Sequence, residues 1–533
     1  MSISEQKETK VETSFLDYEA TKQLMEFARN PFDLTMKGNL NPQRIDRYRT
    51  CGCGLKLLFA TERMDDAVLE ALYKLAEESN VYEKMEQMQN GAVINRIIGY
   101  ESENRSVLHT AMRDLFDNPN TNPKAKEAAG LAKKEHDKLQ AFLKRTEGKF
   151  TDIVTVGIGG SDLGPESIYF ALEHLKKEDR NAHFISNVDP DNGSKVLKNL
   201  NLEKTLVVVI SKSGTTLETV TNEALAKEYF FKAGVNPDGH FIAVTGEGSP
   251  MDDRSKYLEC FYMWDFIGGR YCATAMPGGL LLSFTIGYDN YLELLRGAHA
   301  MDQNALNKDP KKNLPLQLAL NGIWNHNFLD YATNAIIPYS QALGRFPAHI
   351  QQADMESNGK HIDKLGNRVK FKTGPIIWGE PGTNAQHSFF QLIHQGTEIV
   401  HLEFIGFKHS QYGEDVKIEG TTSQEKLLSN LFAQAIALAT GKKSDNPNQE
   451  FLGNRPSTII LADKLTPYTM GALFALYEHK VDFQGFIWGI NSFDQEGVQL
   501  GKVLAGEMMK QFKGDNPNNY PLGAAYLKQL NEE

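Results

Sequence analysis

The sequence predicts an α/β protein built on two doubly wound parallel sheets. Short apolar runs alternate with helical stretches between residues 152 and 264, and the same alternation resumes between residues 334 and 461. Strands that alternate with helices form parallel sheets covered on both faces, because each crossover must carry the chain back to the same edge. The length of 533 residues exceeds one ordinary domain and agrees with two such units.

In the first α/β part, the run 205–210 (Thr-Leu-Val-Val-Val-Ile) is the clearest buried strand of the chain. The other strands expected there are residues 152–158, 182–188, 240–245 and 261–264. Helices are expected at residues 165–177 and from about Thr216 to Lys232. A long polar helix at residues 123–145, rich in Ala, Lys and Glu, precedes them.

In the second part, strands are expected at residues 334–339, 374–378, 398–407 and 457–461, with helices at 424–440 and 468–479. The chain before about Asn118 reads as mostly helical and irregular, with its best helix at residues 64–88. Residues 499–530 read as a helical tail with a Pro/Asn/Gly break at 514–521.

Composition excludes several classes of protein. The net charge of −11 gives nucleic acid no general electrostatic reason to bind. The longest apolar stretches, such as residues 278–288, are too short to span a bilayer, and residues 1–13 lack the apolar core of a secretory signal. The four cysteines match neither a disulfide framework nor a zinc site. We therefore expect a cytoplasmic protein with reduced thiols that binds neither nucleic acid nor membrane.

The first candidate site is the glycine-rich loop that follows strand 152–158 and opens a helix. Gly160 and Ser161 lie in it, and its backbone N–H groups at a positive helix end suit a phosphate or a sugar hydroxyl. A dinucleotide site is the competing interpretation, but its fingerprint needs a third glycine where Asp162 stands. A tight turn without any ligand is the other alternative.

The second candidate site is the Ser-Lys-Ser-Gly-Thr-Thr loop at residues 211–216, directly after the strand 205–210. Hydroxyls, one cation and the free N–H groups of the next helix are the donors that a monophosphate needs. The loop is not a Walker loop, which requires G-x-x-x-x-G-K-[ST]. The alternative is an elaborate helix cap made by Thr215 or Thr216.

Two further motifs hold candidates for acid–base and electrostatic roles. Arg270 follows two glycines that let the backbone approach a ligand closely. Glu356 lies in the polar segment 354–360 at the end of a helical stretch and is a candidate general base. Taken alone, each is at least as compatible with an ordinary surface turn.

The last two motifs are weaker in isolation. His387 follows a Gly/Pro turn and enters an apolar helix, where a histidine is more often packed or solvated than catalytic. Gln495 and Lys502 are seven residues apart, so on one helix they would share a face and could both point into a site.

Together and in this order, the motifs resemble the glucose-6-phosphate isomerase family. The resemblance runs from about Glu101 to Lys502. It is carried by ESENRSVLHTAMR (101–113), the two loops, GGRY (268–271), RFPAHIQQADMESNGK (345–360), GEPGTNAQHSFFQLIHQG (379–396) and NSFDQEGVQLGK (491–502). One departure is Cys272, where the family usually has Ser or Thr, and we expect it to affect packing only.

The resemblance implies an architecture and an assembly. It implies two sugar-isomerase (SIS) domains of three α/β/α layers, at residues 119–300 and 301–505. Residues 1–118 would form an N-terminal helical segment that packs on the second domain, and residues 506–533 a C-terminal helical arm. It also implies a homodimer with shared active sites that interconverts glucose 6-phosphate and fructose 6-phosphate in glycolysis and gluconeogenesis.

The resemblance also implies roles at matching positions. Ser211, Lys212, Ser213 and Thr216 match the phosphate-binding loop, whereas Gly160, Ser161 and Gln495 match positions that contact the sugar. Glu356 matches the general base, Arg270 the arginine that stabilises the enediolate, His387 the ring-opening residue and Lys502 its helper. His387 would come from the partner subunit, and Glu218 would orient it.

The chemistry supports these roles independently. Moving a carbonyl between C1 and C2 needs one base, and a carboxylate such as Glu356 is ionised at neutral pH. A permanently charged Arg270 stabilises the negative intermediate, and His387 titrates in the range needed to protonate the ring oxygen. No step needs a redox cofactor and no His–carboxylate cluster has metal-ligand spacing, so we expect neither cofactor nor metal.

Two alternatives remain open at this point. A non-catalytic SIS-type regulator that binds a sugar phosphate would need the loop 211–216 but not Glu356, His387 and Lys502 together. A dinucleotide oxidoreductase is disfavoured by Asp162 and by the Ser/Thr-rich second loop.

Overall fold

The computed structural model describes residues 13–514 and 520–532. The chain forms two compact units, an N-terminal unit that extends to Ser492 and a C-terminal unit that begins at Phe493. No secretory signal is expected in residues 1–13, and of these only Thr13 lies within the described residues. Most of the break expected at 514–521 also lies outside them.

The first sheet of the N-terminal unit is fully parallel, with the order β6-β5-β7-β8-β9. Its strands are β5 (Asp152–Val156), β6 (Asn181–Ile185), β7 (Thr205–Ser211), β8 (Phe241–Thr245) and β9 (Glu259–Tyr262). Every residue of β7 is buried, as a continuous apolar run in the middle of a two-sided sheet requires.

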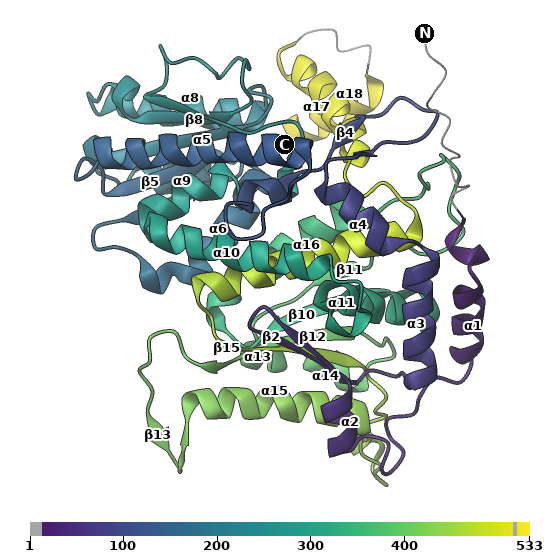
Figure 1. Ribbon diagram of the computed structural model, residues 1–533. Coiled ribbons are helices and arrows are strands. Elements are labelled where there is room, and N and C mark those ends of the chain that lie inside the picture. Colours follow the sequence, from purple (N-terminus) through teal and green to yellow (C-terminus); the bar gives the residue numbers. More distant parts are fainter. Residues whose placement is uncertain (1–12, 515–519, 533) are drawn as a thin grey trace. The chain divides into compact units, whose positions relative to one another are not determined.

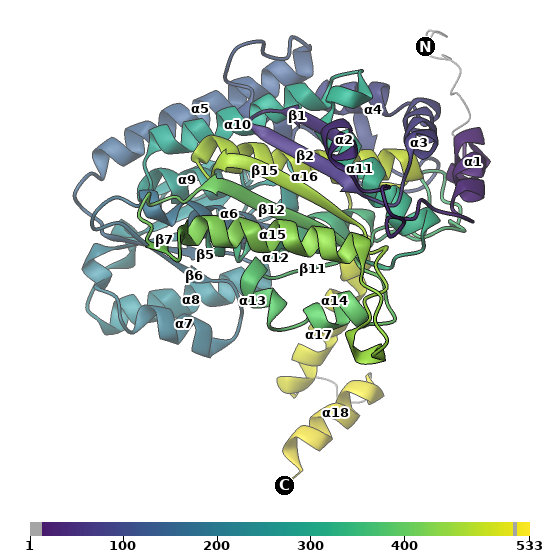
Figure 2. The ribbon, with the colours of Figure 1, turned by 90° about the horizontal axis from the view of Figure 1, so that it is seen from below.

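Helices cover both faces of this sheet (Figure 2). One face carries α7 (Pro190–Leu197) and α8 (Leu217–Lys232). The other carries α5 (Pro123–Arg145), α6 (Gly160–Leu172) and α9 (Met276–Thr285). This arrangement is the three-layer α/β/α architecture that the sequence predicts.

The second sheet has the order β1-β2-β15-β12-β10-β11. Its strands are β1 (Arg49–Gly52), β2 (Leu55–Thr61), β10 (Thr333–Pro338), β11 (Ile376–Trp378), β12 (His401–His409) and β15 (Ser457–Lys464). The last four are parallel, whereas β2 pairs antiparallel with both β15 and β1. The predicted α/β class is confirmed, and the hairpin β1–β2 is an addition that the sequence did not indicate.

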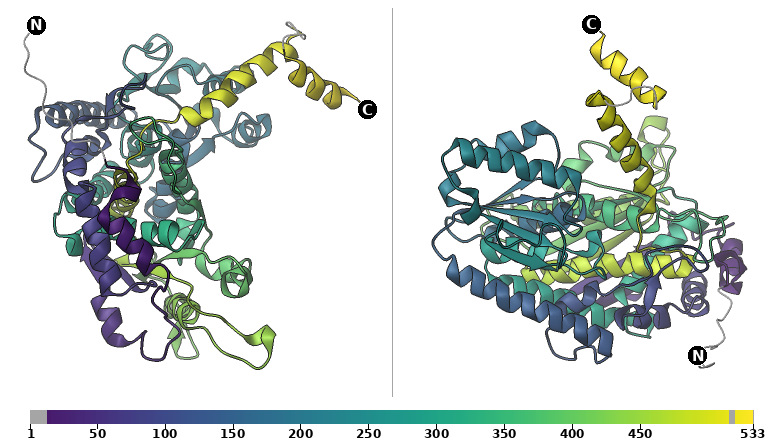
Figure 3. Two further views of the ribbon diagram at one scale, coloured as in Figure 1. Left: turned by 90° about the vertical axis from the view of Figure 1, so that its right-hand side faces the viewer. Right: turned by 90° about the horizontal axis from the view of Figure 1, so that it is seen from above.

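The second sheet is also covered on both faces (Figure 1). On one face lies α15 (Ser423–Thr440), and on the other lie α11 (Leu314–Ile323) and the almost fully buried α16 (Pro467–Trp488), against which α10 (Tyr288–Ala305) packs. Between β12 and α15 the small hairpin of β13 (Lys417–Ile418) and β14 (Thr421–Thr422) projects outward (Figure 3, left).

Several predicted elements differ in their bounds. The helix expected at 64–88 is two helices, α3 (Asp66–Glu78) and α4 (Val81–Gln89), because Asn80 takes a left-handed conformation with φ of 53°. Helix α6 begins at Gly160 rather than at Pro165, which lies inside it. The helix expected at 123–145 coincides with α5.

The remaining elements are short. They are α1 (Glu19–Phe27), α2 (Pro42–Arg47), β3 (Val93–Asn95), β4 (Arg105–Ser106), α12 (Phe346–Gln351), α13 (Gly382–Gln386) and α14 (Phe390–Gln395). The C-terminal unit contains α17 (Gln499–Phe512) and α18 (Pro521–Asn531). Among the described helices, none combines the length and apolarity needed to cross a bilayer. The domain boundaries expected at residues 118, 300 and 505 stay predictions, since both sheets belong to the N-terminal unit.

Candidate active site

The candidate site lies at the carboxyl edge of the first sheet, between its two central strands. Strands β5 and β7 are hydrogen-bonded neighbours, with Val156 opposite Val209, so the loops that follow them run side by side. The winding reverses at these two strands, because β6 lies beyond β5 and β8 beyond β7. Open α/β sheets bind ligands in the crevice at such a point.

The loop after β7 is pre-organised by its own hydroxyls. Ser211 Oγ lies 2.9 Å from Thr216 Oγ1, and the backbone N–H of Thr215 donates to Ser213 Oγ over 3.2 Å. Gly214 takes a φ of 68°, which lets the loop turn sharply. Thr216 is the N-cap of α8, but its side chain makes no capping bond. The helix-cap alternative is therefore wrong for Thr216, and no side chain in the described part of the chain accepts from the N–H groups in the first turn of α8.

Lys212 is directed from this loop toward the turn that carries Arg270. Its Nζ donates to the backbone carbonyl of Ile267 over 2.9 Å. Burial, followed by the positive charge of Arg105, lowers the pKa of Lys212. A partly desolvated ammonium beside uncapped helix N–H groups is suited to a bound anion.

Gly160 brings the first loop into direct contact with the turn before Arg270. A Cβ built on Gly160 would lie 2.0 Å from the carbonyl oxygen of Gly269 and 2.6 Å from the backbone nitrogen of Arg270. No side chain fits in that space, so the glycine is required by the close approach of two backbones. Cys272 supports the same contact, because its Sγ donates to the carbonyl of Gly160 over 3.3 Å.

Arg270 and Glu356 form the centre of the site. Glu356 ends the π-helical turn η10 (Gln352–Glu356), which continues α12, and π-helical turns are frequent at functional sites. Arg270 Nη1 lies 3.3 Å from Glu356 Oε2, and the two side chains are 1% and 23% exposed. Gln352 Nε2 donates to the same oxygen over 3.1 Å. A buried guanidinium thus faces a carboxylate that remains accessible on one side.

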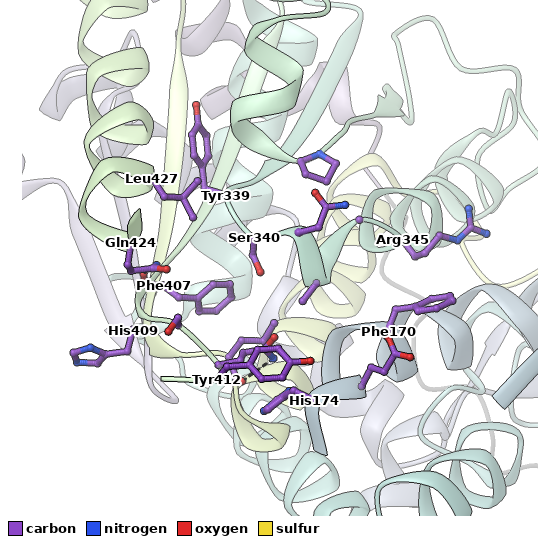
Figure 4. Close-up of a pocket in the computed structure, with 18 of the residues that line it drawn as sticks. Phe170, His174, Tyr339, Ser340, Arg345, Phe407, His409, Tyr412, Gln424 and Leu427 are labelled. Carbon is purple, nitrogen blue, oxygen red and sulfur yellow. Dashed lines mark hydrogen bonds between the residues drawn. The ribbon is translucent and has the colours of Figure 1, made fainter. Parts of the chain in front are cut away.

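The second sheet has the same winding and also opens at its reversal point, between β10 and β12. A cavity of about 770 Å³ lies there, lined by residues that follow both strands, among them Ser340 and Tyr412 (Figure 4). Its size suits a small ligand. The catalytic candidates do not line it.

The helix beside this second cavity differs from α8 in one decisive respect. The carboxylate of Asp415 accepts hydrogen bonds from the N–H groups of Ser423 and Gln424, each 2.9 Å long. Thr422 Oγ1 accepts from the N–H of Glu425 over 3.1 Å. The first turn of α15 is therefore occupied by the chain's own acceptors, whereas the N-cap side chain of α8 makes no such bond and leaves that helix end available for a phosphate.

His387 and Glu218 lie outside the Arg270–Glu356 contact. His387 is exposed at the end of α13, and Glu218 is partly exposed in the first turn of α8. The side chain of Glu356 is in contact with Gln352 and Arg270 and not with His387 or Glu218, among the described residues.

Gln495 and Lys502 belong to the C-terminal unit, and the argument that they share a helix face is wrong. Lys502 lies in α17, which begins at Gln499. Gln495 precedes the short turn η12 (Glu496–Val498) and has an extended φ of −146°. The spacing of seven residues therefore does not place the two side chains on one helix.

Comparison with known proteins decides the family. A family model described as phosphoglucose isomerase matches residues 58–521. The chain belongs to the phosphoglucose isomerase family. It is 59% identical to a glucose-6-phosphate isomerase of Protochlamydia amoebophila over 523 residues, which covers 97% of each chain. It is 52% identical to a glucose-6-phosphate isomerase of Chlamydia pneumoniae over 517 residues, covering 97% of this chain and 98% of that one.

A solved structure agrees with this family membership. The crystal structure of a glucose-6-phosphate isomerase from Chlamydia trachomatis superposes with a TM-score of 0.95 at 49% identity, over 97% of this chain and 100% of that chain.

Sequence reasoning missed some residues of the site. Ser357 accepts a hydrogen bond from Arg270 and is itself hydrogen-bonded to Tyr271, and Gln352 donates to Glu356. The sequence motifs assigned no role to these three residues. Ser357 lies inside the MESNGK motif of the phosphoglucose isomerase family, so its place next to Glu356 was the available signal. Among the described residues, no group of three or more His, Cys, Asp or Glu side chains is placed to hold a metal ion.

Proposed function

We propose that this chain catalyses the reversible isomerisation of D-glucose 6-phosphate to D-fructose 6-phosphate, the activity that the names of its relatives state. The observation that carries the proposal is the 3.3 Å contact between Arg270 Nη1 and Glu356 Oε2 beside an uncapped phosphate loop. A sugar-phosphate sensor would need the loop but no accessible carboxylate paired with a buried guanidinium.

Glu356 is the base in this proposal. Its carboxylate takes the proton from C2 of the open-chain aldose and returns it to C1, while the hydroxyl proton moves from O2 to O1, through a cis-enediol intermediate. The negative charge that develops on the O1 and O2 oxygens is stabilised by Arg270, whose guanidinium does not give up its proton. Since Arg270 is almost fully buried, its charge acts without competition from bulk water.

Substrate binding belongs to the two loops. The hydroxyls of Ser211, Ser213 and Thr216, the Lys212 ammonium and the first N–H groups of α8 bind the 6-phosphate. Gly160 and Ser161 line the sugar. Holding the phosphate far from C1 fixes the reacting carbons against Glu356. No cofactor takes part in this proposed reaction.

Ring opening needs a second copy of the chain. We assign it to the partner subunit's His387, which protonates the ring oxygen with the help of Lys502, and Glu218 orients that imidazole. Gln495 contacts the substrate. The exposed position of His387 supports a homodimer with shared active sites. The proposed compartment is the cytoplasm, in keeping with four free cysteines and a sugar-phosphate substrate.

The test is turnover of glucose 6-phosphate by the wild-type chain and by Glu356→Gln. We expect the variant to keep its affinity for a substrate-analogue phosphate and to lose about 10²- to 10⁴-fold in kcat, the usual contribution of a general base. Glu228→Gln, at an exposed position on α8, is the matched control and should match the wild type. Sugar-phosphate binding without turnover by the wild type would instead support the regulator.

A further inference from the structure

The guanidinium of Arg270 is held from three directions. Its Nε donates to Ser357 Oγ over 2.6 Å, one Nη donates to the carbonyl of Ser492 over 2.6 Å, and the other faces Glu356 at 3.3 Å. Of these three partners, only Glu356 has a proposed role in proton transfer. The other two fix where the charge sits.

The hydroxyl of Ser357 is hydrogen-bonded in turn to a residue deeper in the protein. Ser357 Oγ lies 3.3 Å from Tyr271 Oη, and Tyr271 Oη donates to Asp482 Oδ1 over 3.1 Å. Because the tyrosine proton goes to the carboxylate, the serine proton is the one shared between the two hydroxyls. The hydrogen bonds therefore run in one direction, from Arg270 through Ser357 and Tyr271 to Asp482.

Asp482 is itself anchored by a buried ion network. Its Oδ2 lies 3.3 Å from His479 Nδ1, and His479 Nε2 lies 2.7 Å from Asp302 Oδ1. Burial opposes a charged imidazole, but hydrogen bonds to Asp302 and Asp482 outweigh it and raise the pKa of His479 to about 9. Arg113 closes the network with a two-pronged contact to Asp302, 2.6 and 2.8 Å long, and a 2.7 Å bond to Glu478.

This network lies beyond the reach of substrate. Ser357 and Asp482 are 0% exposed, Tyr271 is 1% exposed, and His479 is 0% exposed. Glu478, His479 and Asp482 are carried by one helix, α16, which gives the network a rigid support. Buried polar networks whose members are paired fix a single geometry.

We propose that Ser357, Tyr271 and Asp482 are positioning residues that fix the Arg270 guanidinium against Glu356 for the isomerisation. The inference rests on the proposed function, because it assigns Arg270 a role in the reaction. Removing the hydroxyl of Ser357 or Tyr271 leaves the Arg270 guanidinium charged but no longer held in one position. Since the phosphate loop still binds substrate, the loss should appear in kcat and not in KM.

Tyr271→Phe is the cleanest test, because it deletes one oxygen and keeps the ring, which stacks on His109 with centroids 4.5 Å apart. The matched control is Tyr291→Phe. Tyr291 is likewise buried, at 0% exposure, and its hydroxyl donates to the backbone carbonyl of Thr274 over 2.9 Å. Both variants lose buried hydrogen bonding of a tyrosine hydroxyl, so both should lose stability, and Tyr271→Phe should lose more because its hydroxyl contacts both Ser357 and Asp482.

We expect Tyr271→Phe to lower kcat by about 10- to 100-fold, as a misplacement on the ångström scale does, with KM changed less than about threefold. Tyr291→Phe should keep kcat within about twofold of the wild type although it too loses a buried hydrogen bond. Ser357→Ala should act like Tyr271→Phe. A kcat of Tyr271→Phe close to that of Tyr291→Phe would overturn the proposal.

A double-mutant cycle with Arg270→Ala separates positioning from general stability. If Tyr271 acts through Arg270, its substitution should have no further effect on kcat once the arginine is gone. An equal loss in both backgrounds would overturn the positioning role. The wild type is assayed alongside, so absence of its turnover would overturn the proposed function and is distinguishable from failure of this inference.

Discussion

Gly160→Ala tests the close approach of the two backbones that build the site. The added Cβ would lie 2.0 Å from Gly269 O, 2.2 Å from Gly269 C and 2.6 Å from Arg270 N. These are backbone atoms, so no flexible side chain can move aside. Since Cβ contacts below 3.0 Å are essentially never seen, helix α6 and the Arg270 turn must separate by about 1 Å.

The size of the effect follows from that displacement. A shift of about 1 Å in a positioned catalytic group costs about 10²-fold in rate. Overpacking of a buried contact costs about 1–3 kcal/mol in the free energy of unfolding. We therefore expect Gly160→Ala to fold with a lowered melting temperature and to lose about 10²-fold in kcat/KM.

The assay measures kcat/KM and thermal unfolding for Gly160→Ala and for Gly130→Ala. Gly130 lies inside α5 with no atom within 4 Å of its added Cβ. The control should keep full activity and gain about 0.5–1 kcal/mol, since alanine is the better helix former. Activity of Gly160→Ala within threefold of the wild type would refute the reasoning.

Three further predictions concern assembly, pH and metals. If active sites are shared, a mixture of inactive His387→Ala and Glu356→Gln chains that is unfolded and refolded together should recover about one quarter of wild-type activity. Half of the dimers would then contain one chain of each kind, and each of these carries one intact site. No recovery of activity would contradict shared sites. Burial, followed by the charge of Glu166, raises the pKa of Asp162 to about 7. The folded state therefore binds this proton more tightly than the unfolded state, and stability falls as pH rises from about 4 to 7. Asp162→Asn should remove that slope and melt higher than the wild type at pH 8 but not at pH 4, which thermal scans at both pH values can check. Activity should survive prolonged treatment with EDTA; a loss that added divalent metal restores would contradict the metal-free reaction.

The first sheet was predictable because its signals are local. Strand β7 is a continuous apolar run that ends in a polar loop, and the helix α8 follows at once. The hairpin β1–β2 was not predictable in the same way. Strand β2 is stabilised by pairing with β15, so that Leu57 lies opposite Ile460 some four hundred residues later. Nothing in the local pattern of residues 49–61 indicates that partner.

The residues of the site also differ in whether a local motif marks them. Glu356 and Arg270 were identified from short motifs, and the structure brings them into contact although they lie 86 residues apart in sequence. Tyr271 and Asp482, which stand behind them, lie 211 residues apart in sequence and share no motif. Periodicity alone also failed for Gln495 and Lys502, because the backbone turns before α17 begins.

The most direct test of the central claim follows hydrogen at the reacting carbons. The wild-type chain is incubated with fructose 6-phosphate in D2O, and the product is examined by NMR. Proton transfer through Glu356 predicts glucose 6-phosphate that carries deuterium at C2, because the carboxylate exchanges its proton with solvent between the two transfers. Glucose 6-phosphate free of deuterium at C2 would contradict the account, and so would the absence of any glucose 6-phosphate.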